Sequence, residues 1–280
     1  MPTVSPEPER AAAAGLHQRR ATAESFGADA QRYDRARPRY PTALVHRILD
    51  LTPPAPGPPH VLDVGCGTGI VARQLQEAGC RVLGVEPDPR MADLARRSKV
   101  AVEEARFEQW EAAGRTYDAV VAGQAWHWVD PVAGAAGAAR ALRPGGLLAP
   151  FWNAFELPPE LADAVAEACR RALPDAPFDV RALGRGTKGG YGTLLAGAAD
   201  GIRATGAFEE PQQWRHEWEW RYTRDAWLDQ LPTQGAFTRL PAPALAAVLE
   251  GVGAAVDALG GSFTMRYATV AVTALVRGDG

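Results

Sequence analysis

Residues 61–69 read VLDVGCGTG, and this stretch decides the fold. A short apolar run ends in three glycines at alternate positions, Gly65, Gly67 and Gly69. The pattern predicts a buried strand followed by a tight turn into a helix, because glycine enters backbone conformations that other residues avoid. A turn of this kind brings bare backbone close to a ligand and commonly holds a nucleotide.

The spacing of the glycines separates the kinds of nucleotide that such a turn binds. A phosphate-binding Walker loop closes with Gly-Lys-Ser/Thr, whereas Gly69 is followed by Ile70 and Val71, so ATP bound in that mode is excluded. The dinucleotide fingerprint G-x-G-x-x-G needs a third glycine at position 70, where the chain has Ile70. The spacing G-x-G-x-G instead favours a flat floor, free of side chains, for a cofactor without phosphates.

Two acidic residues agree with this interpretation. Asp63 lies inside the predicted strand, where its carboxylate can orient the loop or meet a cationic amino group. Glu86 ends the next apolar run, RVLGVE, where a carboxylate accepts hydrogen bonds from both hydroxyls of a ribose. An acidic residue there also serves NAD, so the glycine spacing, and not Glu86, discriminates between cofactors.

Strand and helix patterns alternate around the glycine loop. This alternation predicts an α/β fold, a mostly parallel sheet with helices on both faces. A period-two pattern over 214–222 and the last apolar run predict an antiparallel strand pair at the C-terminus. The predicted strands are 60–65, 81–86, 99–107, 117–124, 145–153, 214–222 and 262–276.

The composition is that of a soluble globular protein. The chain has 280 residues, 46% of them hydrophobic, and a formal net charge of −3, which lacks the basic footprint of nucleic-acid binding. No apolar run approaches the about 20 residues that cross a bilayer, and no secretory signal is seen. Cys66, Cys80 and Cys169 form no metal or disulfide pattern. We expect a cytoplasmic monomer or homodimer without metal, membrane or nucleic-acid partner.

The chain divides into five expected segments. The stretch from 174 to 201 is predicted to be loose, because it is rich in glycine. Its Arg181, Arg185 and Lys188 make it either a lid for an anionic or polar small molecule or a solvated loop. The segments are a disordered tail 1–22, an N-terminal helical cap and Pro-rich connector 23–59, a cofactor-binding core 60–153, a helical or lid insertion 154–210, and a C-terminal strand–helix–strand unit 211–280.

Four motifs follow one another in order: VLDVGCGTG, VLGVEPDPRM, YDAVVAGQAWHWVD and ALRPGGLL. They resemble the ordered motifs of class I S-adenosylmethionine-dependent methyltransferases, over roughly residues 25–153. FGADAQRYDRARPRYP before the core and QAWHW after the fourth strand resemble the small-molecule branch that includes trans-aconitate methyltransferase-like enzymes. The resemblance implies a Rossmann-like sheet, S-adenosylmethionine as the cofactor and a small molecule as the methyl acceptor.

The resemblance also implies which residues hold the cofactor. The glycine loop lines the methionine moiety, Glu86 holds the ribose, and Gln124 lies under the sulfonium. Arg37 pairs with the methionine carboxylate, a contact that suits a guanidinium group. Pro87 and Met91 flank the adenine. The complete implied set is Tyr33, Arg37, Tyr40, Asp63, Gly65, Cys66, Gly67, Gly69, Glu86, Pro87, Met91, Phe107, Glu108 and Gln124.

The substrate is expected beyond the carboxyl ends of the strands, as in other open α/β sheets. Trp126, His127 and Trp128 follow the fourth strand, and Trp152 and Asn153 end the fifth, so these residues are candidates for the pocket wall. For His127 three roles stay open: a general base, a contact to the substrate, or a histidine packed between tryptophans.

The leading hypothesis is methyl transfer to an oxygen of a small molecule. A carboxylate nucleophile needs no base, whereas a hydroxyl usually benefits from one. Methylation at nitrogen or carbon stays open, as does a protein that binds S-adenosylmethionine without methylating. A nucleic-acid or protein methyltransferase is opposed by the net charge and by the lack of an Asn-Pro-Pro-Tyr-like segment after the fourth strand.

Overall fold

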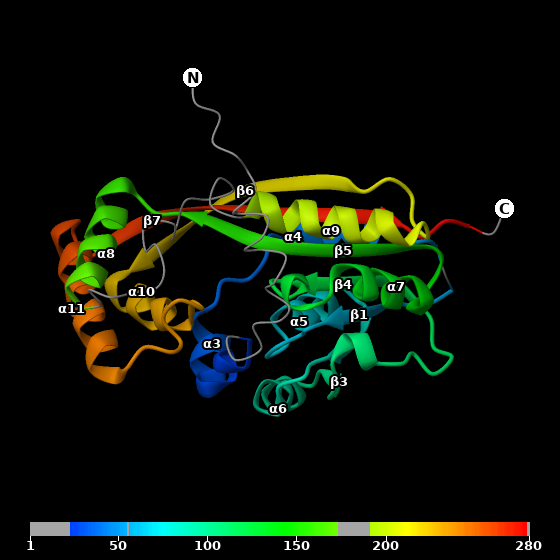
Figure 1. The fold of residues 1–280 in the computed structure, drawn as a ribbon, viewed down its shortest axis with the longest axis horizontal. Helices are drawn as coiled ribbons and strands as arrows, with labels where there is room; N and C mark the ends of the chain where they lie inside the picture. The colour runs from blue at the N-terminus through cyan, green and yellow to red at the C-terminus, as the bar shows by residue number, and fades with distance from the viewer. Residues whose placement is uncertain (1–22, 55, 173–190, 279–280) are drawn as a thin grey trace, which may run out of the picture.

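The computed structural model describes residues 23–54, 56–172 and 191–278. One sheet of seven strands crosses the molecule in the order β3-β2-β1-β4-β5-β7-β6 (Figure 1). Neighbours among β1 to β5 are parallel, and β7 is antiparallel to both β5 and β6. The α/β fold, with its antiparallel C-terminal pair, is therefore confirmed. The strands are β1 His60–Val64, β2 Arg81–Val85, β3 Ala101–Glu103, β4 Tyr117–Gly123, β5 Leu142–Glu156, β6 Gln212–Thr223 and β7 Ser262–Leu275.

Helices cover both faces of the parallel part. Along β4, Val120 and Ala122 join one hydrophobic cluster, and Ala119 and Val121 join another, because successive side chains point to opposite faces. This explains why the run DAVVA is apolar throughout. α7 (Pro131–Ala141) and α9 (Tyr191–Thr205) pack on the first face; α4 (Thr42–Asp50), α5 (Ile70–Glu77) and α6 (Pro89–Arg97) pack on the other.

The N-terminal segment consists of the 3-10 helix η2 (Glu24–Asp29) and the helix α3 (Ala30–Ala36). Asp29 caps α3, because its side chain accepts a hydrogen bond from the backbone N–H of Arg32. The chain is extended at Arg37, directly before Pro38, as expected for a residue that precedes proline.

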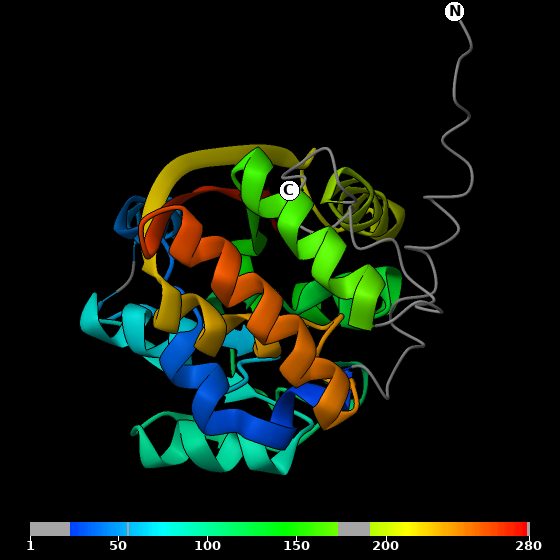
Figure 2. The ribbon, with the colours of Figure 1, turned by 90° about the vertical axis from the view of Figure 1, so that its left-hand side faces the viewer.

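The strands β5, β6 and β7 run well past the parallel part and carry a second group of helices at their far ends (Figures 1 and 2). We call this group the distal lobe; it comprises α8 (Pro159–Ala172), α10 (Arg224–Gln230), η7 (Leu231–Thr233) and α11 (Ala242–Ala258). It has its own hydrophobic cluster, in which Trp227 and Phe237 are fully buried. Figure 1 shows α3 between the distal lobe and the helices of the parallel part.

Three predictions along the chain need correction or lie outside the description. The third strand is three residues long and not the predicted 99–107, and Phe107–Gln109 form a 3-10 turn instead. The prediction of loose chain up to about residue 201 is wrong from Tyr191 onward, where α9 begins. The first part of that stretch, with Arg181, Arg185 and Lys188, lies outside the described residues, as does the predicted tail 1–22.

Small residues in α9 serve close packing rather than flexibility. A Cβ added at Gly201 would lie 2.4 Å from the carbonyl oxygen of Pro131, so α9 approaches the start of α7 more closely than a side chain permits. Ala198, Ala199 and Ile202 are buried beside it. The glycine-rich composition predicted a loop, whereas Gly201 permits a close contact between two helices.

We expect Gly201→Ala to destabilise the protein by about 1–3 kcal/mol, because the added methyl group overpacks a contact with rigid backbone. Gly197→Ala is the matched control in the same helix, since a Cβ there meets no atom within 4 Å. The control should be neutral or stabilising by about 0.5–1 kcal/mol. Urea unfolding of both variants measures the difference, and equal stabilities would contradict the close packing of α9 on α7.

Candidate functional site

A cavity that is open to solvent lies at the carboxyl ends of β1 and β4. Its wall combines the N-terminal segment, the glycine loop, the ends of β4 and β5, and the distal lobe. The predicted site residues on this wall are Tyr33, Arg37, Tyr40, Asp63, Gly65, Cys66, Gly67, Gln124 and Asn153.

The glycine loop forms a floor without side chains. Gly65 and Gly67 have φ angles of 62° and 55°, in the left-handed region that favours glycine. A Cβ at Gly65 would lie 2.6 Å from the Cβ of Ala125, whereas one at Gly67 would meet no described atom within 4 Å. Since Gly67 lines the cavity, its missing side chain leaves open space for a ligand.

Asp63 presents a carboxyl group without a partner to this floor. Only 1% of the residue is exposed, and neither carboxyl oxygen has a hydrogen-bond partner in the described part of the chain. Burial, and secondarily the nearby charge of Glu86, raises the pKa of Asp63 to about 8. Burying an acceptor without a donor costs free energy. A cationic ligand would therefore satisfy this carboxyl group best.

Glu86 supports the loop from the neighbouring strand. Its Oε2 accepts a hydrogen bond of 2.8 Å from the backbone N–H of Gly67, and its Oε1 accepts one of 2.9 Å from the N–H of Asp88. Burial raises the pKa of Glu86 to about 7, while these two N–H groups oppose the rise. Glu86 does not lie on the cavity wall, so its predicted contact to a ribose stays a prediction.

Arg37 is the cation of the wall. Its guanidinium group lies 4.8 Å from the ring centroid of Tyr33 and donates a 2.5 Å hydrogen bond to the backbone carbonyl of Thr233. Its Nε is buried without a partner, and no ion pair joins Arg37 to a residue within the described ranges. Among the described wall residues, Arg37 is thus the one cation and Asp63 the one carboxyl group, and neither has a partner of opposite charge there.

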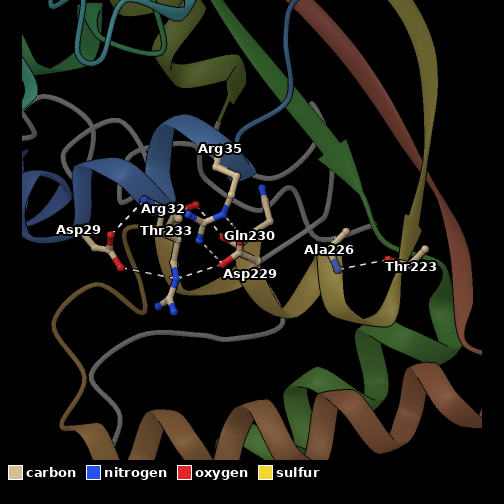
Figure 3. A network of polar contacts seen from close by, with 8 residues as sticks. All are labelled: Asp29, Arg32, Arg35, Thr223, Ala226, Asp229, Gln230 and Thr233. Carbon is tan, nitrogen blue, oxygen red and sulfur yellow. Dashed lines mark hydrogen bonds and ion pairs between the residues drawn. The ribbon is translucent and has the colours of Figure 1, made fainter. Parts of the chain in front are cut away.

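The N-terminal segment is tied to both sides of the cavity. Arg73 of α5 forms a 2.7 Å ion pair with Asp34 of α3 and donates a 2.7 Å hydrogen bond to the carbonyl of Thr68 in the glycine loop. On the other side, Arg32 and Arg35 both bind Asp229 of the distal lobe, at 3.2 and 2.8 Å (Figure 3). These contacts hold the segment across the cavity.

The residues predicted for the adenine and ribose side are not brought to this wall. Met91 and Phe107 are buried in the fold, and Phe107 packs 6.0 Å from Trp110 and 6.2 Å from Trp126 between ring centroids. Glu108 accepts a hydrogen bond from the backbone N–H of Asp130. The predicted cofactor residues off the cavity wall are Gly69, Glu86, Pro87, Met91, Phe107 and Glu108.

His127 does not lie on the cavity wall, and neither do Trp126, Trp128 and Trp152. The indole N–H of Trp152 donates a 3.0 Å hydrogen bond to Nδ1 of His127, and burial lowers the pKa of His127 to about 4. Trp152 points to the sheet face opposite to that of Asn153, because neighbours along a strand alternate. The geometry supports the packed histidine and does not support a general base.

The distal lobe, the turn after η7 and the strands β5 and β7 supply wall residues that the sequence did not predict. Gln230 is 1% exposed and its Oε1 has no partner in the part of the chain described, and Gln234 has an unpartnered buried Nε2. Phe155 and Tyr267 complete this end of the cavity. The available signal was weak: two glutamines, four positions apart, beside apolar residues far from the motifs.

Two kinds of feature are absent from residues 23–54, 56–172 and 191–278. No helix there combines the length and apolar character that a membrane crossing requires. No group of three His, Cys, Asp or Glu side chains there is arranged to hold a metal ion.

Three features together define the class I methyltransferase fold. They are the strand order, the glycine loop, and the acidic residues Asp63 in β1 and Glu86 directly after β2. Residues 33–150 match the family model described as a methyltransferase domain. The chain therefore carries a class I S-adenosylmethionine-dependent methyltransferase domain. The trans-aconitate-like branch stays a prediction.

Known proteins with similar sequences are methyltransferases. An uncharacterized methyltransferase of Mycobacterium tuberculosis is 39% identical over 137 residues, 48% of this chain and 54% of that protein. The malonyl-[acyl-carrier protein] O-methyltransferase of Enterobacter lignolyticus is 32% identical over 173 residues, 60% of this chain and 65% of that protein. The chain thus matches between half and two thirds of the length of these relatives.

A solved structure shares the fold over most of the chain. It is assigned to a type II methyltransferase from Anaeromyxobacter dehalogenans, with 26% identity and a TM-score of 0.61. The similarity covers 87% of this chain and 99% of that one, so it includes parts of the chain beyond the methyltransferase domain match.

We expect Asp63→Asn to raise the melting temperature of the ligand-free protein at pH 8 by several degrees. The folded state keeps a proton on Asp63 up to a pKa of about 8, well above the ordinary pKa of 3.8. Between these values the unfolded chain binds fewer protons, so stability falls as the pH rises, and asparagine removes this loss.

The difference between Asp63→Asn and the wild type should shrink as the pH falls and vanish below the ordinary pKa of 3.8, where the aspartate is protonated in both states. Asp225→Asn is the control, because the Asp225 side chain is 92% exposed. Thermal unfolding followed by circular dichroism at pH 5 and pH 8 measures both variants. A pH-independent difference would contradict the raised pKa.

Proposed function

We propose that the protein transfers a methyl group from S-adenosylmethionine to an oxygen of a small molecule, either a carboxylate or a hydroxyl. One observation carries the proposal: a single cavity joins the bare glycine floor and the unpartnered carboxyl group of Asp63 to the unpaired cation Arg37. This pair of opposite charges matches the ammonium and carboxylate of an amino acid moiety.

The wall fits the methionine part of S-adenosylmethionine. Asp63 would meet the ammonium group, Arg37 would pair with the carboxylate, and the backbone of Gly65 and Gly67 would lie beneath the chain that joins them. The Asp63 carboxyl oxygens and the Nε of Arg37 lack hydrogen-bond partners within the described residues, so the ligand would satisfy polar atoms that are otherwise costly to bury. When bound, this cofactor supplies a methyl group on a sulfonium that is already strongly electrophilic.

The remaining work of the protein is to hold the acceptor in line and to keep water out. Gln124, at the end of β4, has a φ of 56° and donates a 3.4 Å hydrogen bond to the backbone carbonyl of Asn153. This contact joins the wall residues of β4 and β5 beside the glycine floor. The N-terminal segment, held by Arg73 and Asp229, covers the cavity.

Support for oxygen as the acceptor comes from the relatives and the charge. The relative from Enterobacter lignolyticus is an O-methyltransferase, although the match covers 65% of it. The net charge of −3 offers nucleic acid no basic surface. Methylation at nitrogen or carbon, and binding of the cofactor without methyl transfer, are the outcomes that the following experiment separates from the proposal.

The test is transfer of labelled methyl from S-adenosylmethionine to pooled small molecules, divided into carboxylic acids, phenols and alcohols, and amines. We expect label in the carboxylic acids or in the hydroxyl compounds. Label confined to the amines contradicts transfer to oxygen. An unlabelled result in every pool, together with tight binding of S-adenosylhomocysteine, contradicts an enzyme of this type and favours a binding protein.

Cofactor binding should release protons, because Asp63 is protonated at neutral pH and an ammonium partner favours its ionised form. At pH 7 we expect the release to approach one proton per molecule of S-adenosylhomocysteine bound. Titration calorimetry in phosphate and in Tris buffers, which differ in ionisation enthalpy, measures it.

Asp63→Asn should abolish this proton release and weaken binding by at least about tenfold, or about 1.4 kcal/mol. Asp93→Asn is the control on the surface, since its side chain is 61% exposed. Equal proton release in Asp63→Asn and the wild type would show that another group titrates.

A further inference from the structure

A chain of three side chains crosses the extended strands and ends at the cavity. The indole N–H of Trp218 in β6 donates a 2.9 Å hydrogen bond to Oγ1 of Thr269 in β7. The hydroxyl of Thr269 donates a 2.6 Å hydrogen bond to Oδ1 of Asn153 in β5. Asn153 lies on the cavity wall, and Thr269 does not.

The direction of this chain follows from its first member. An indole nitrogen is a donor only, so the Thr269 hydroxyl accepts from Trp218 and keeps its single hydrogen for the other neighbour. That neighbour, Asn153, must therefore present its carbonyl oxygen to Thr269. The two N–H bonds of its Nδ2 are then the polar groups that Asn153 offers to the cavity.

Two of the three hydrogen-bonded side chains are buried, and the third is held by an aromatic stack. Thr269 is 0% exposed and Asn153 is 5% exposed. Thr269 is directly opposite Asn153 in the register of β5 and β7. The ring of Trp218 stacks on Tyr267, with 4.3 Å between centroids and 12° between planes. The hydrogen bonds fix one orientation of the Asn153 amide, because a flip would leave the buried hydroxyl of Thr269 without an acceptor.

Among the described residues, the end of the cavity around Asn153 contains the amide groups of Asn153, Gln230 and Gln234 and no base. Gln234 adds an unpartnered Nε2, and the described wall has no histidine, lysine or glutamate. Burial raises the pKa of Tyr267 well above its ordinary value, so its phenol stays protonated. The carboxyl group on the described wall, Asp63, lies in β1 directly before the glycine loop.

We infer, resting on the proposed function, that the methyl acceptor is a carboxylate held by the Nδ2 hydrogens of Asn153, and that Thr269 and Trp218 are positioning residues that orient this amide. A hydroxyl acceptor would have to lose a proton, and the described residues at this end offer no group to take it. A carboxylate brings acceptor oxygens that suit the amide donors and carries no proton to remove.

The reaction balances without an acid or a base. A lone pair of the carboxylate oxygen forms the new bond to the methyl carbon as the bond from that carbon to sulfur breaks. The bonding electron pair stays on sulfur, so a sulfonium and a carboxylate become a neutral thioether and a methyl ester. No proton moves in this step.

The first experiment identifies the product bond. The protein is incubated with labelled S-adenosylmethionine and with acidic, neutral and basic fractions of a low-molecular-weight bacterial extract, and the products are treated with mild alkali. We expect label in the acidic fraction that alkali releases as volatile methanol, which is the behaviour of an ester. Label that resists alkali overturns the carboxylate and leaves methyl transfer intact. A lack of label in every fraction overturns the proposed function itself.

The second experiment tests the positioning residues with the carboxylic acid found in this way. Thr269→Val removes the hydroxyl at almost constant shape, and Thr269→Ser keeps it. We expect Thr269→Val to raise KM for the acid about tenfold, with a smaller change in kcat, and Thr269→Ser to stay close to the wild type. Trp218→Phe should act in the same direction as Thr269→Val.

Two readouts separate positioning from a general loss of structure. The affinity for S-adenosylhomocysteine, measured by calorimetry, should be unchanged in both Thr269 variants. The acid should raise the melting temperature of the S-adenosylhomocysteine complex in the wild type and Thr269→Ser, and not in Thr269→Val. An unchanged KM and an unchanged thermal shift in Thr269→Val would overturn the role of this chain.

Discussion

The burial of a carboxyl group beneath a bare glycine turn is the constraint on which the site depends. Asp63 carries two oxygens without donors in the described chain, and its pKa is raised to about 8 by that environment. Glu86 fixes the turn above it through the N–H of Gly67. The unpartnered buried carboxyl group lowers the stability of the protein, and such a cost persists at functional sites where the surrounding fold enforces it. The site is thereby prepared for a cationic ligand.

The long strands decide where the rest of the cavity comes from. Because β5, β6 and β7 extend past the parallel part, they carry a second hydrophobic cluster and place Gln230 opposite the glycine loop. The N-terminal segment bridges the two sides by contacts of different character. The ion pair of Arg73 with Asp34 is mostly buried, whereas Arg35, which pairs with Asp229, is 60% exposed, so salt weakens the attachment to the distal lobe more.

Local patterns predicted the parallel core, because its elements are stabilised by neighbours close in sequence. The apolar runs, the glycine spacing and Asp63 each indicate their structure within a few residues. Where the prediction of a loose chain failed, a distant contact decides, because Gly201 packs on Pro131. His127, whose role the sequence left open, accepts a hydrogen bond from Trp152, in a strand that begins 15 residues later. Gln230 and Gln234 reach the cavity only because the distal lobe folds back over it.

The division of the wall along the chain has an evolutionary consequence. The methyltransferase domain match ends at residue 150, and the wall residues after it are Asn153, Phe155, Gln230, Gln234 and Tyr267. The wall residues that would hold the cofactor and those that would select the acceptor thus lie in separate parts of the sequence. Substitutions in the later part can change which compound is accepted. The earlier part, which matches the methyltransferase domain, can stay the same meanwhile.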